Sequence, residues 1–239
     1  MNSPDPEYPN MMKSTASFTP KMEDYLRHLY RLEQETDSRV SNSAIAGRLG
    51  VTPPTVSSML ETLSDRGLIE RERYRPVRLT TEGKELALGV IRRHRLVETM
   101  LSELFDYTIS EIDTEADILE HHLSPRLCGE IEQLLDMPEI DPHGDPIPDT
   151  NLNIPPTKDA TSLNEVSESS CVKVTRILTQ DDETLDYLIS TGIEPSVRFR
   201  LEEKTPIGMV TITFSDTEQQ TSLPQGIASQ ILVSPVDDF

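Results

Sequence analysis

Histidine is rare in this chain, and two short stretches combine it with carboxylates at helical spacing. Five histidines occur in 239 residues. The stretch RRHRLVE places His94 and Glu98 four residues apart, on one face of a helix. His94 also falls in line with an apolar stripe, which is typical of a hydrogen-bonded core histidine, so the spacing leaves both interpretations open. His28 and His143 belong to no such pattern.

The stretch DTEADILEHH carries the fuller set of metal-type donors. Asp117, Glu120 and His121 are related as i, i+3 and i+4, which directs them to one side of a helix, and Asp113 lies one turn earlier. Mixed oxygen and imidazole ligands suit Mn²⁺ or Fe²⁺ without excluding Zn²⁺. His122 is turned by about 100° from His121 and is not expected to be a ligand. In an acidic chain, a carboxylate-rich helix is also typical of a solvent-exposed face. Spacing alone therefore does not decide between a metal site and a solvated helix face.

Charge is distributed unevenly along the chain. The whole sequence has 42 acidic and 22 basic residues, a net charge of −20. Residues 1–100 hold 15 basic and 14 acidic side chains, whereas residues 101–239 hold 7 and 28. Arginine is concentrated in 66–78 and 92–95, so nucleic acid is a possible partner of the first part. Strong overall acidity is also typical of proteins that work in multimolar salt, which predicts a halophilic host.

Composition argues against membrane and secreted classes. No run of about 18 apolar residues is present, and the N-terminus has neither a basic nor an apolar signal region. Two cysteines provide neither a disulfide framework nor a CxxC metal knuckle. We therefore expect a cytoplasmic protein with no membrane partner.

The elements that must position the donors begin with a helix-turn-helix. Apolar spacing predicts a helix from Pro20, a second helix ending at Leu49, and a third, capped by Thr52, from Pro53 to about Asp65. Two short helices joined by a tight Gly-containing turn are the helix-turn-helix plan. The stretch LIERERYRPVRLT alternates apolar and polar residues, which predicts a two-stranded wing.

The third helix would present hydroxyl groups outward, where a recognition helix meets the bases, and nearby arginines would contact phosphates. The expected DNA-contacting residues are Thr52, Pro54, Thr55, Ser57, Ser58, Arg39, Arg48, Arg73 and Arg75. The alternative is a three-helix packing unit that binds protein rather than DNA.

Beyond the wing, the pattern predicts helices and then a small sheet domain. Thr81 would cap a long helix from Glu82 to about Phe105, and further helices would cover 110–123 and about Pro125–Leu135. Residues 138–156 are rich in proline and predict an extended connector. In the remainder of the chain, apolar residues mostly recur at every second position, as in β-strands, and one predicted helix near 182–190 interrupts this pattern. The pattern fits a small all-β barrel.

Motifs in several elements together resemble one known family. MEDYLRHLYRLE, SNSAIAGRLGVTPPTVSSMLETLSDRGLIERERYRPVRLTTEG, RRHRLVETML, EADILEHHLS and DPHGDPIP, in this order, resemble the diphtheria toxin repressor / manganese transport regulator family over about 18–149. The stretch LDYLISTGIEPSVRF resembles the SH3-like domain of its longer members. The resemblance implies a metal-activated, homodimeric repressor that binds double-stranded operator DNA and controls metal-uptake genes.

The implied architecture is an α+β multidomain chain with four parts. They are a winged helix-turn-helix domain (18–81), an all-helical dimerisation and metal-binding domain (82–140), a connector (141–165), and a small SH3-like β-barrel (166–235).

The resemblance also implies roles for particular residues. Asp24 joins Asp117, Glu120 and His121 in the primary metal site, and carboxylates in place of sulfur ligands favour Mn²⁺, with Fe²⁺ next. It assigns His94 and Glu98 to a neighbouring metal site. Asp113 replaces a family histidine there, and Asp181 would be an ancillary ligand in the barrel. Manganese-type members have a glutamate where this chain has Arg27, so a binuclear site of that type is not expected.

Two other functions remain as alternatives. A metallohydrolase could also use clustered histidine and carboxylates to activate water, although no nucleophile elbow or Gly-rich loop accompanies them. A winged-helix regulator could instead respond to a small organic ligand. The repressor interpretation predicts no enzymatic activity and no small-molecule substrate.

Overall fold

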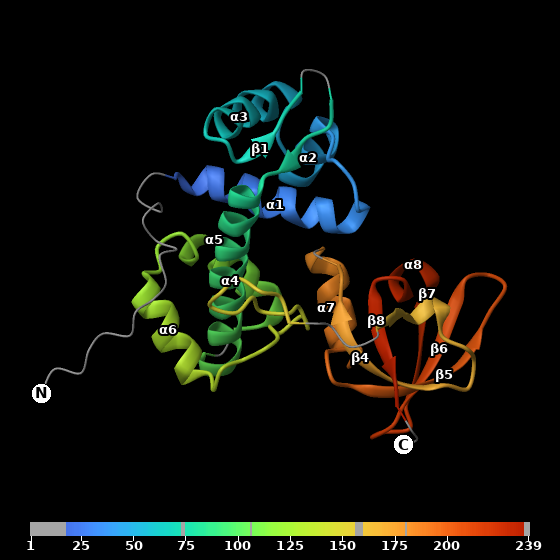
Figure 1. Cartoon of the computed structure of the whole chain (residues 1–239). Coiled ribbons are helices and arrows are strands. Elements are labelled where there is room, and N and C mark those ends of the chain that lie inside the picture. Colours follow the sequence, from blue (N-terminus) through green and yellow to red (C-terminus); the bar gives the residue numbers. More distant parts are fainter. Residues whose placement is uncertain (1–17, 73–74, 106, 156–159, 180, 237–239) are drawn as a thin grey trace, which may run out of the picture. The chain divides into compact units, whose positions relative to one another are not determined.

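The computed structural model describes residues 18–72, 75–105, 107–155, 160–179 and 181–236 (Figure 1). The chain divides into two compact units. The first contains the chain up to Val97 together with Asp117–Asp136 and Pro148–Ile154, and the second contains the remainder.

The first unit begins with the predicted helix-turn-helix. Three helices pack around one apolar core that includes Leu26, Ile45 and Leu60, all fully buried. Gly50 ends the second helix with a φ of 61°, the left-handed conformation that glycine adopts easily. The helices are α1 (Pro20–Thr36), α2 (Asn42–Leu49) and α3 (Pro53–Asp65).

Two predicted helix caps need correction. Thr52 stands at the N-cap position of α3, but its side chain caps no backbone amide and its Oγ1 lies 2.9 Å from Thr55 Oγ1. Thr81 is the first residue of α4 rather than its cap. The hydroxyl of Thr80 accepts the amide of Gly83 at 3.1 Å and takes that role.

The predicted wing is confirmed as a short hairpin. Strands β1 (Ile69–Glu70) and β2 (Arg78–Leu79) are antiparallel, with Ile69 opposite Leu79. Arg73, one of the predicted DNA contacts, lies outside the described residues.

Three further helices follow: α4 (Thr81–Leu104), α5 (Ile109–Leu119) and α6 (Pro125–Leu134). The prediction that α5 would continue to residue 123 is wrong. Arg93 Nε donates to the Glu120 carbonyl at 2.7 Å, and the His122 amide donates to Leu119 at 2.9 Å in a tight turn. Glu120 and His121 therefore lie in the turn after α5, not on the helix.

The second unit holds a six-stranded antiparallel sheet in the order β3-β8-β4-β5-β6-β7. Its core consists of alternating aliphatic side chains with Phe199 and Phe214. Helix α7 (Asp182–Ser190) interrupts the strands where the sequence predicted a helix, and a 3₁₀ turn (Leu163–Glu165) and the short α8 (Gln225–Ala228) complete the domain. The strands are β3 (Thr161–Ser162), β4 (Cys171–Ile177), β5 (Arg198–Lys204), β6 (Met209–Phe214), β7 (Gln220–Pro224) and β8 (Ile231–Pro235).

The proline-rich stretch predicted as an extended connector is folded. Asp141 Oδ1 accepts the amides of His143 and Asp145 at 2.9 and 2.8 Å. Gly144 has a φ of 86°, and a Cβ on it would lie 2.1 Å from the Thr175 carbonyl of β4. Only glycine therefore allows this turn to lie so close to the sheet.

None of the helices in the described ranges is long and apolar enough to cross a membrane.

Gly83 is expected to be essential for the packing of α4. A Cβ at this position would lie 2.0 Å from the Leu68 carbonyl, so Gly83→Ala must displace backbone and should lower the free energy of unfolding by about 1–3 kcal/mol. The measurement is urea unfolding at fixed salt, followed by circular dichroism. Gly89→Ala is the control on the same helix, where the nearest atom is 3.8 Å away; it should be neutral or stabilising by about 0.5–1 kcal/mol. Equal stability of the two variants would contradict the packing argument.

Candidate metal centre

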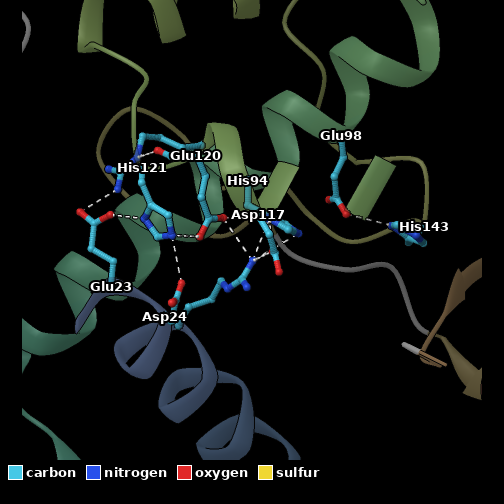
Figure 2. Close-up of polar contacts among 10 residues, drawn as sticks. Glu23, Asp24, His94, Glu98, Asp117, Glu120, His121 and His143 are labelled. Carbon is cyan, nitrogen blue, oxygen red and sulfur yellow. Dashed lines mark hydrogen bonds and ion pairs between the residues drawn. The ribbon is translucent and has the colours of Figure 1, made fainter. Parts of the chain in front are cut away.

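Two parts of the first unit bring three metal-type donors together. Asp24 is on α1, and Glu120 and His121 come from the turn after α5 (Figure 2). His121 Nε2 lies 3.0 Å from Asp24 Oδ1 and 3.4 Å from Glu120 Oε1. One donor atom from each residue lies within 4.8 Å of the other two. These three residues were all predicted as ligands, and here they converge.

The chemistry of this donor set fits a divalent cation. Glu120 is fully buried, and within the described part of the chain its Oε1 accepts no hydrogen bond. A buried carboxylate oxygen without such a bond is costly. A divalent ion bound by Asp24, Glu120 and His121 would satisfy this oxygen.

His121 is oriented by a second carboxylate. Its Nδ1 lies 2.6 Å from Glu23 Oε2, and Glu23 also pairs with Arg93 at 3.1 Å (Figure 2). This contact directs Nε2 toward Asp24 and Glu120. A carboxylate behind a ligating histidine fixes the ring and strengthens it as a donor.

The same contacts determine the protonation of His121 in the metal-free molecule. Burial acts to lower its pKa, but hydrogen bonds to Asp24 and Glu23 and the charge of Glu120 outweigh burial and raise the pKa to about 9. Without metal, His121 therefore carries a proton at neutral pH and donates to both carboxylates. A metal ion must displace the proton on Nε2.

Asp117 and His94 lie around an arginine rather than with Asp24. Arg27 Nη1 donates to Asp117 Oδ1 at 2.7 Å and to Glu120 Oε2 at 3.2 Å, and it lies 2.8 Å from His94 Nδ1. Arg27 is 3% exposed and His94 is fully buried. In the structure Asp117 shares Arg27 with Glu120 of the Asp24 centre, and the predicted role of Asp117 as a metal ligand stays a prediction.

Glu98 belongs to a separate cluster in the second unit. Its Oε1 lies 3.5 Å from His143 Nδ1 (Figure 2). Donor atoms of Glu98, Asp141 and His143 all lie within 4.8 Å of one another. Glu98 is 2% exposed and Asp141 is 4% exposed. One imidazole and two buried carboxylates form a second set that could hold a cation.

Asp113 and Asp181 are the two remaining predicted ligands. Asp113 lies on α5, one turn before Asp117. Asp181 is exposed and caps α7, where its Oδ2 accepts the amide and the hydroxyl of Thr184 at 2.9 and 2.7 Å. These bonds lower the pKa of Asp181. Neither assignment as a metal ligand is tested by these contacts.

The predicted DNA-contacting residues lie at the start of α3 and around it. Thr52, Pro54 and Ser58 are exposed, whereas Thr55 and Ser57 are half-buried. Ser57 Oγ accepts the side-chain amide of Asn42 at 3.1 Å.

The three predicted phosphate-contacting arginines within the described residues already have carboxylate partners. Arg39 pairs with Glu70 at 2.7 Å, Arg48 with Glu35 at 2.7 Å, and Arg75 with Glu72 at 3.0 Å. Arg75 and both glutamates 70 and 72 are largely exposed, so these pairs are open to exchange with phosphate.

Sequence reasoning missed three residues of these clusters. Glu23 is adjacent to Asp24, but its role depends on which way His121 points. Asp141 and His143 were available in DPHGDPIP, where a histidine stands between two aspartates in a turn-forming stretch. The resemblance placed Arg27 at the position of a metal-site glutamate, but it did not predict the contact between Arg27 and Asp117.

Comparisons with known proteins identify the family. The family model "Iron dependent repressor, N-terminal DNA binding domain" matches residues 17–77, "Iron dependent repressor, metal binding and dimerisation domain" matches 80–149, and the FeoA domain matches 161–235. The iron-dependent repressor IdeR of Mycobacterium tuberculosis is 32% identical over 225 residues, covering 90% of this chain and 96% of IdeR. The chain belongs to the iron-dependent repressor family. The diphtheria toxin repressor of Corynebacterium glutamicum is 31% identical over 181 residues, covering 72% of this chain and 79% of that protein.

Solved structures give the same assignment for the repressor. A manganese-dependent transcriptional repressor in complex with manganese is 33% identical, with a TM-score of 0.82, and the match covers 90% of this chain and all of that one. The manganese regulator SloR is 30% identical, with a TM-score of 0.72 over 92% of this chain and all of that one.

The family consists of metal-dependent transcriptional repressors, which are not enzymes. The repressor prediction and the predicted α+β multidomain fold are confirmed, and the metallohydrolase alternative is wrong.

Metal binding by the repressor is expected to release a proton. Because the pKa of His121 is about 9, a divalent ion must displace close to one proton per subunit at pH 7.5, and its apparent affinity should rise up to about tenfold per pH unit between pH 6 and 9. Calorimetric Mn²⁺ titration in two buffers of different ionisation enthalpy measures the proton count. Glu23→Gln removes one of the groups that raise this pKa and should reduce the pH dependence. A proton count near zero for the wild type at pH 7.5 would contradict the prediction.

Proposed function

We propose that this repressor binds double-stranded operator DNA as a homodimer when a divalent ion occupies Asp24, Glu120 and His121, and that it represses metal-uptake genes. The observation that carries the proposal is the fully buried Glu120, whose Oε1 faces Asp24 and His121 without accepting a hydrogen bond from the described residues.

Mn²⁺ is the ion we propose, with Fe²⁺ as the next candidate. The donors are two carboxylates and one imidazole, and hard oxygen ligands suit Mn²⁺. Cys128 lies on α6, where burial raises the pKa of its thiol, so it does not offer a ready thiolate. The similarity to a manganese-loaded repressor agrees with this choice.

Helix α1 can transmit the state of the metal centre to the wing. Near its N-terminal end, Asp24 belongs to the donor set. Farther along the same helix, the buried Glu33 accepts the Leu79 amide of strand β2 at 2.6 Å. A bound divalent ion would supply positive charge between carboxylates that otherwise repel. Ordering of α1 by that charge therefore also orders the wing.

DNA contacts are proposed for the exposed start of α3 and the arginines around it. Hydroxyls of Thr52, Thr55, Ser57 and Ser58, with Pro54, would face bases and backbone, because a recognition helix uses its N-terminal residues. Arg39, Arg48, Arg73 and Arg75 would bind phosphates. Since Glu70, Glu35 and Glu72 hold three of these arginines, phosphate must replace carboxylate, and the net gain in each contact is modest.

Dimerisation is proposed through the helical region. Leu127 and Leu134 are 49% and 67% exposed and lie seven residues apart on one face of α6, and Ile118 of α5 is 57% exposed. Large apolar side chains at such exposure are typical of a covered interface.

Glu98, Asp141 and His143 are proposed as a second metal site. The turn that carries Asp141 and His143 is attached to the sheet domain, because the Ile177 amide of β4 donates to the His143 carbonyl at 3.0 Å and Arg176 pairs with Asp145. The SH3-like domain would thus position two of the three ligands.

We also propose the domain division 18–81, 82–140, 141–165 and 166–235, a cytoplasmic location and a high-salt host. A repressor must share a compartment with its operator, and the net charge of −20 suits high salt.

Asp24→Asn should abolish metal-dependent DNA binding. It removes one ligand charge while keeping the size of the side chain, and the expected loss is about 100-fold in the metal-induced gain, or about 2.7 kcal/mol. The probe is a duplex selected from a randomised pool with Mn²⁺-loaded protein, and binding is followed by fluorescence anisotropy with Mn²⁺ and then with excess chelator.

Asp37→Asn is the matched control, because Asp37 is an exposed C-cap of the same helix at a φ of 47°, which asparagine tolerates. Wild-type DNA binding that survives the chelator would overturn the proposed function, as would an unchanged response of Asp24→Asn.

His143→Ala should remove one class of bound ion and leave the other. Calorimetry should then count one Mn²⁺ fewer per subunit, with the Asp24 centre retained. His122→Ala is the control, because His122 is an exposed histidine outside the donor sets of the described residues. An unchanged ion count in folded His143→Ala would exclude the second site.

A further inference from the structure

The guanidinium of Arg27 lies where a second cation would bind. Arg27 is 3% exposed on α1, and its Nη1 is 2.7 Å from Asp117 Oδ1, 2.8 Å from His94 Nδ1 and 3.2 Å from Glu120 Oε2. The three residues that carry these partner atoms lie on α5, on α4 and in the turn after α5 (Figure 2). One nitrogen atom therefore lies among two carboxylate oxygens and an imidazole nitrogen.

The three partner atoms of Arg27 Nη1 are spaced like the ligands of a metal ion. His94 Nδ1 is 2.8 Å from Glu120 Oε2 and 3.3 Å from Asp117 Oδ1. Neighbouring ligands of an ion bound at about 2.1 Å in octahedral geometry are about 3 Å apart. Without the arginine, this set of atoms could bind a divalent ion next to the one proposed at Asp24, with Glu120 bridging both through its two oxygens.

Formal charge also argues for one divalent ion rather than two. Asp24, Asp117 and Glu120 carry three negative charges. One divalent ion and the Arg27 guanidinium neutralise them, and nearby Glu23 is already paired with Arg93. A second divalent ion beside the buried Arg27 and Glu120 would leave an excess of positive charge there, which is costly.

Asp24 and Arg27 both project from one face of helix α1. Asp24 and Arg27 are three residues apart, so they project to the same side of the helix. The first provides a ligand for the proposed ion, and the second provides a permanent cation beside it.

We infer that Arg27 is a tethered cation that takes the second position of what would otherwise be a two-metal centre, so that the Asp24, Glu120 and His121 centre holds a single divalent ion. The inference rests on the proposed function, since it requires that this centre binds metal. Arg27 acts here as a positioning residue: it keeps His94, Asp117 and one oxygen of Glu120 in place with or without metal.

The test counts Mn²⁺ ions and asks whether they are close to one another. The full-length chain carries Glu98→Gln and His143→Ala in all samples, which empties the other proposed site. Calorimetry gives the ion count at fixed salt. Electron paramagnetic resonance separates isolated Mn²⁺ from a spin-coupled pair about 3.5–4 Å apart, the spacing of two-metal sites.

With Arg27 present, one isolated ion per subunit is expected. Arg27→Glu and Arg27→Gln should each bind a second ion that is coupled to the first, whereas Arg27→Lys keeps a cation and should retain one. Arg31→Gln, one turn farther along α1, is the control for loss of a positive charge and should also retain one.

A coupled pair in the protein with Arg27 intact overturns the inference, and so does a single isolated ion in folded Arg27→Glu and Arg27→Gln. If those two variants do not fold, the sample with Arg27 intact decides, since an isolated ion supports the inference and a coupled pair refutes it. Binding of no ion when Arg27 is intact instead refutes the proposed function, so the two failures are distinguishable.

Discussion

The buried carboxylate of Glu120 is the group on which the polar centre depends. It has no exposure to solvent, and an isolated charge in such a place costs several kcal/mol unless it is paired. Its Oε2 is paired with Arg27, and its Oε1 faces His121 Nε2 at 3.4 Å. Because Arg27 belongs to α1, its pairing with Glu120 forms only when α1 packs against the turn after α5, whereas the protonated His121 lies in that turn itself. Docking of α1 therefore completes the compensation of the Glu120 charge.

The same helix connects this centre to the DNA-binding elements. Glu23, Asp24 and Arg27 occupy its first turns, and Glu33 reaches strand β2 of the wing near its other end. All four are charged, yet Glu23, Arg27 and Glu33 are less than a tenth exposed. Buried charges of this kind stabilise little by themselves, but they fix one arrangement, since misplacing any of them leaves another unpaired. A helix held at both ends by such contacts moves as a unit.

In the second unit, the sheet domain holds the turn that carries Asp141 and His143. The turn with Asp141 and His143 packs on β4 through Gly144, Arg176 and the Ile177 amide. Asp141 is buried there because its Oδ1 accepts two amides of the same turn. The sheet thus holds in place a turn that faces Glu98. The sheet domain, which matches the FeoA family model, therefore supports the Glu98, Asp141 and His143 cluster in this chain.

Local sequence determined the helices, the wing, and the identity of most donors. Apolar periodicity predicted α1, α2 and α3, alternation predicted the wing and the sheet domain, and the i, i+3, i+4 pattern indicated Asp117, Glu120 and His121. These features are local because they depend on neighbours within a few residues.

Only the tertiary structure decided how the donors are grouped. The helix containing Asp117 stops before Glu120, and Arg93, from another helix, donates to the Glu120 carbonyl. Asp117 then contacts Arg27, 90 residues away, while Glu120 and His121 face Asp24. Likewise Glu98 meets His143 through a turn held on the sheet. Spacing fixes directions along one helix, but the partner of a charged side chain depends on which elements pack together and on how the buried charges neutralise one another.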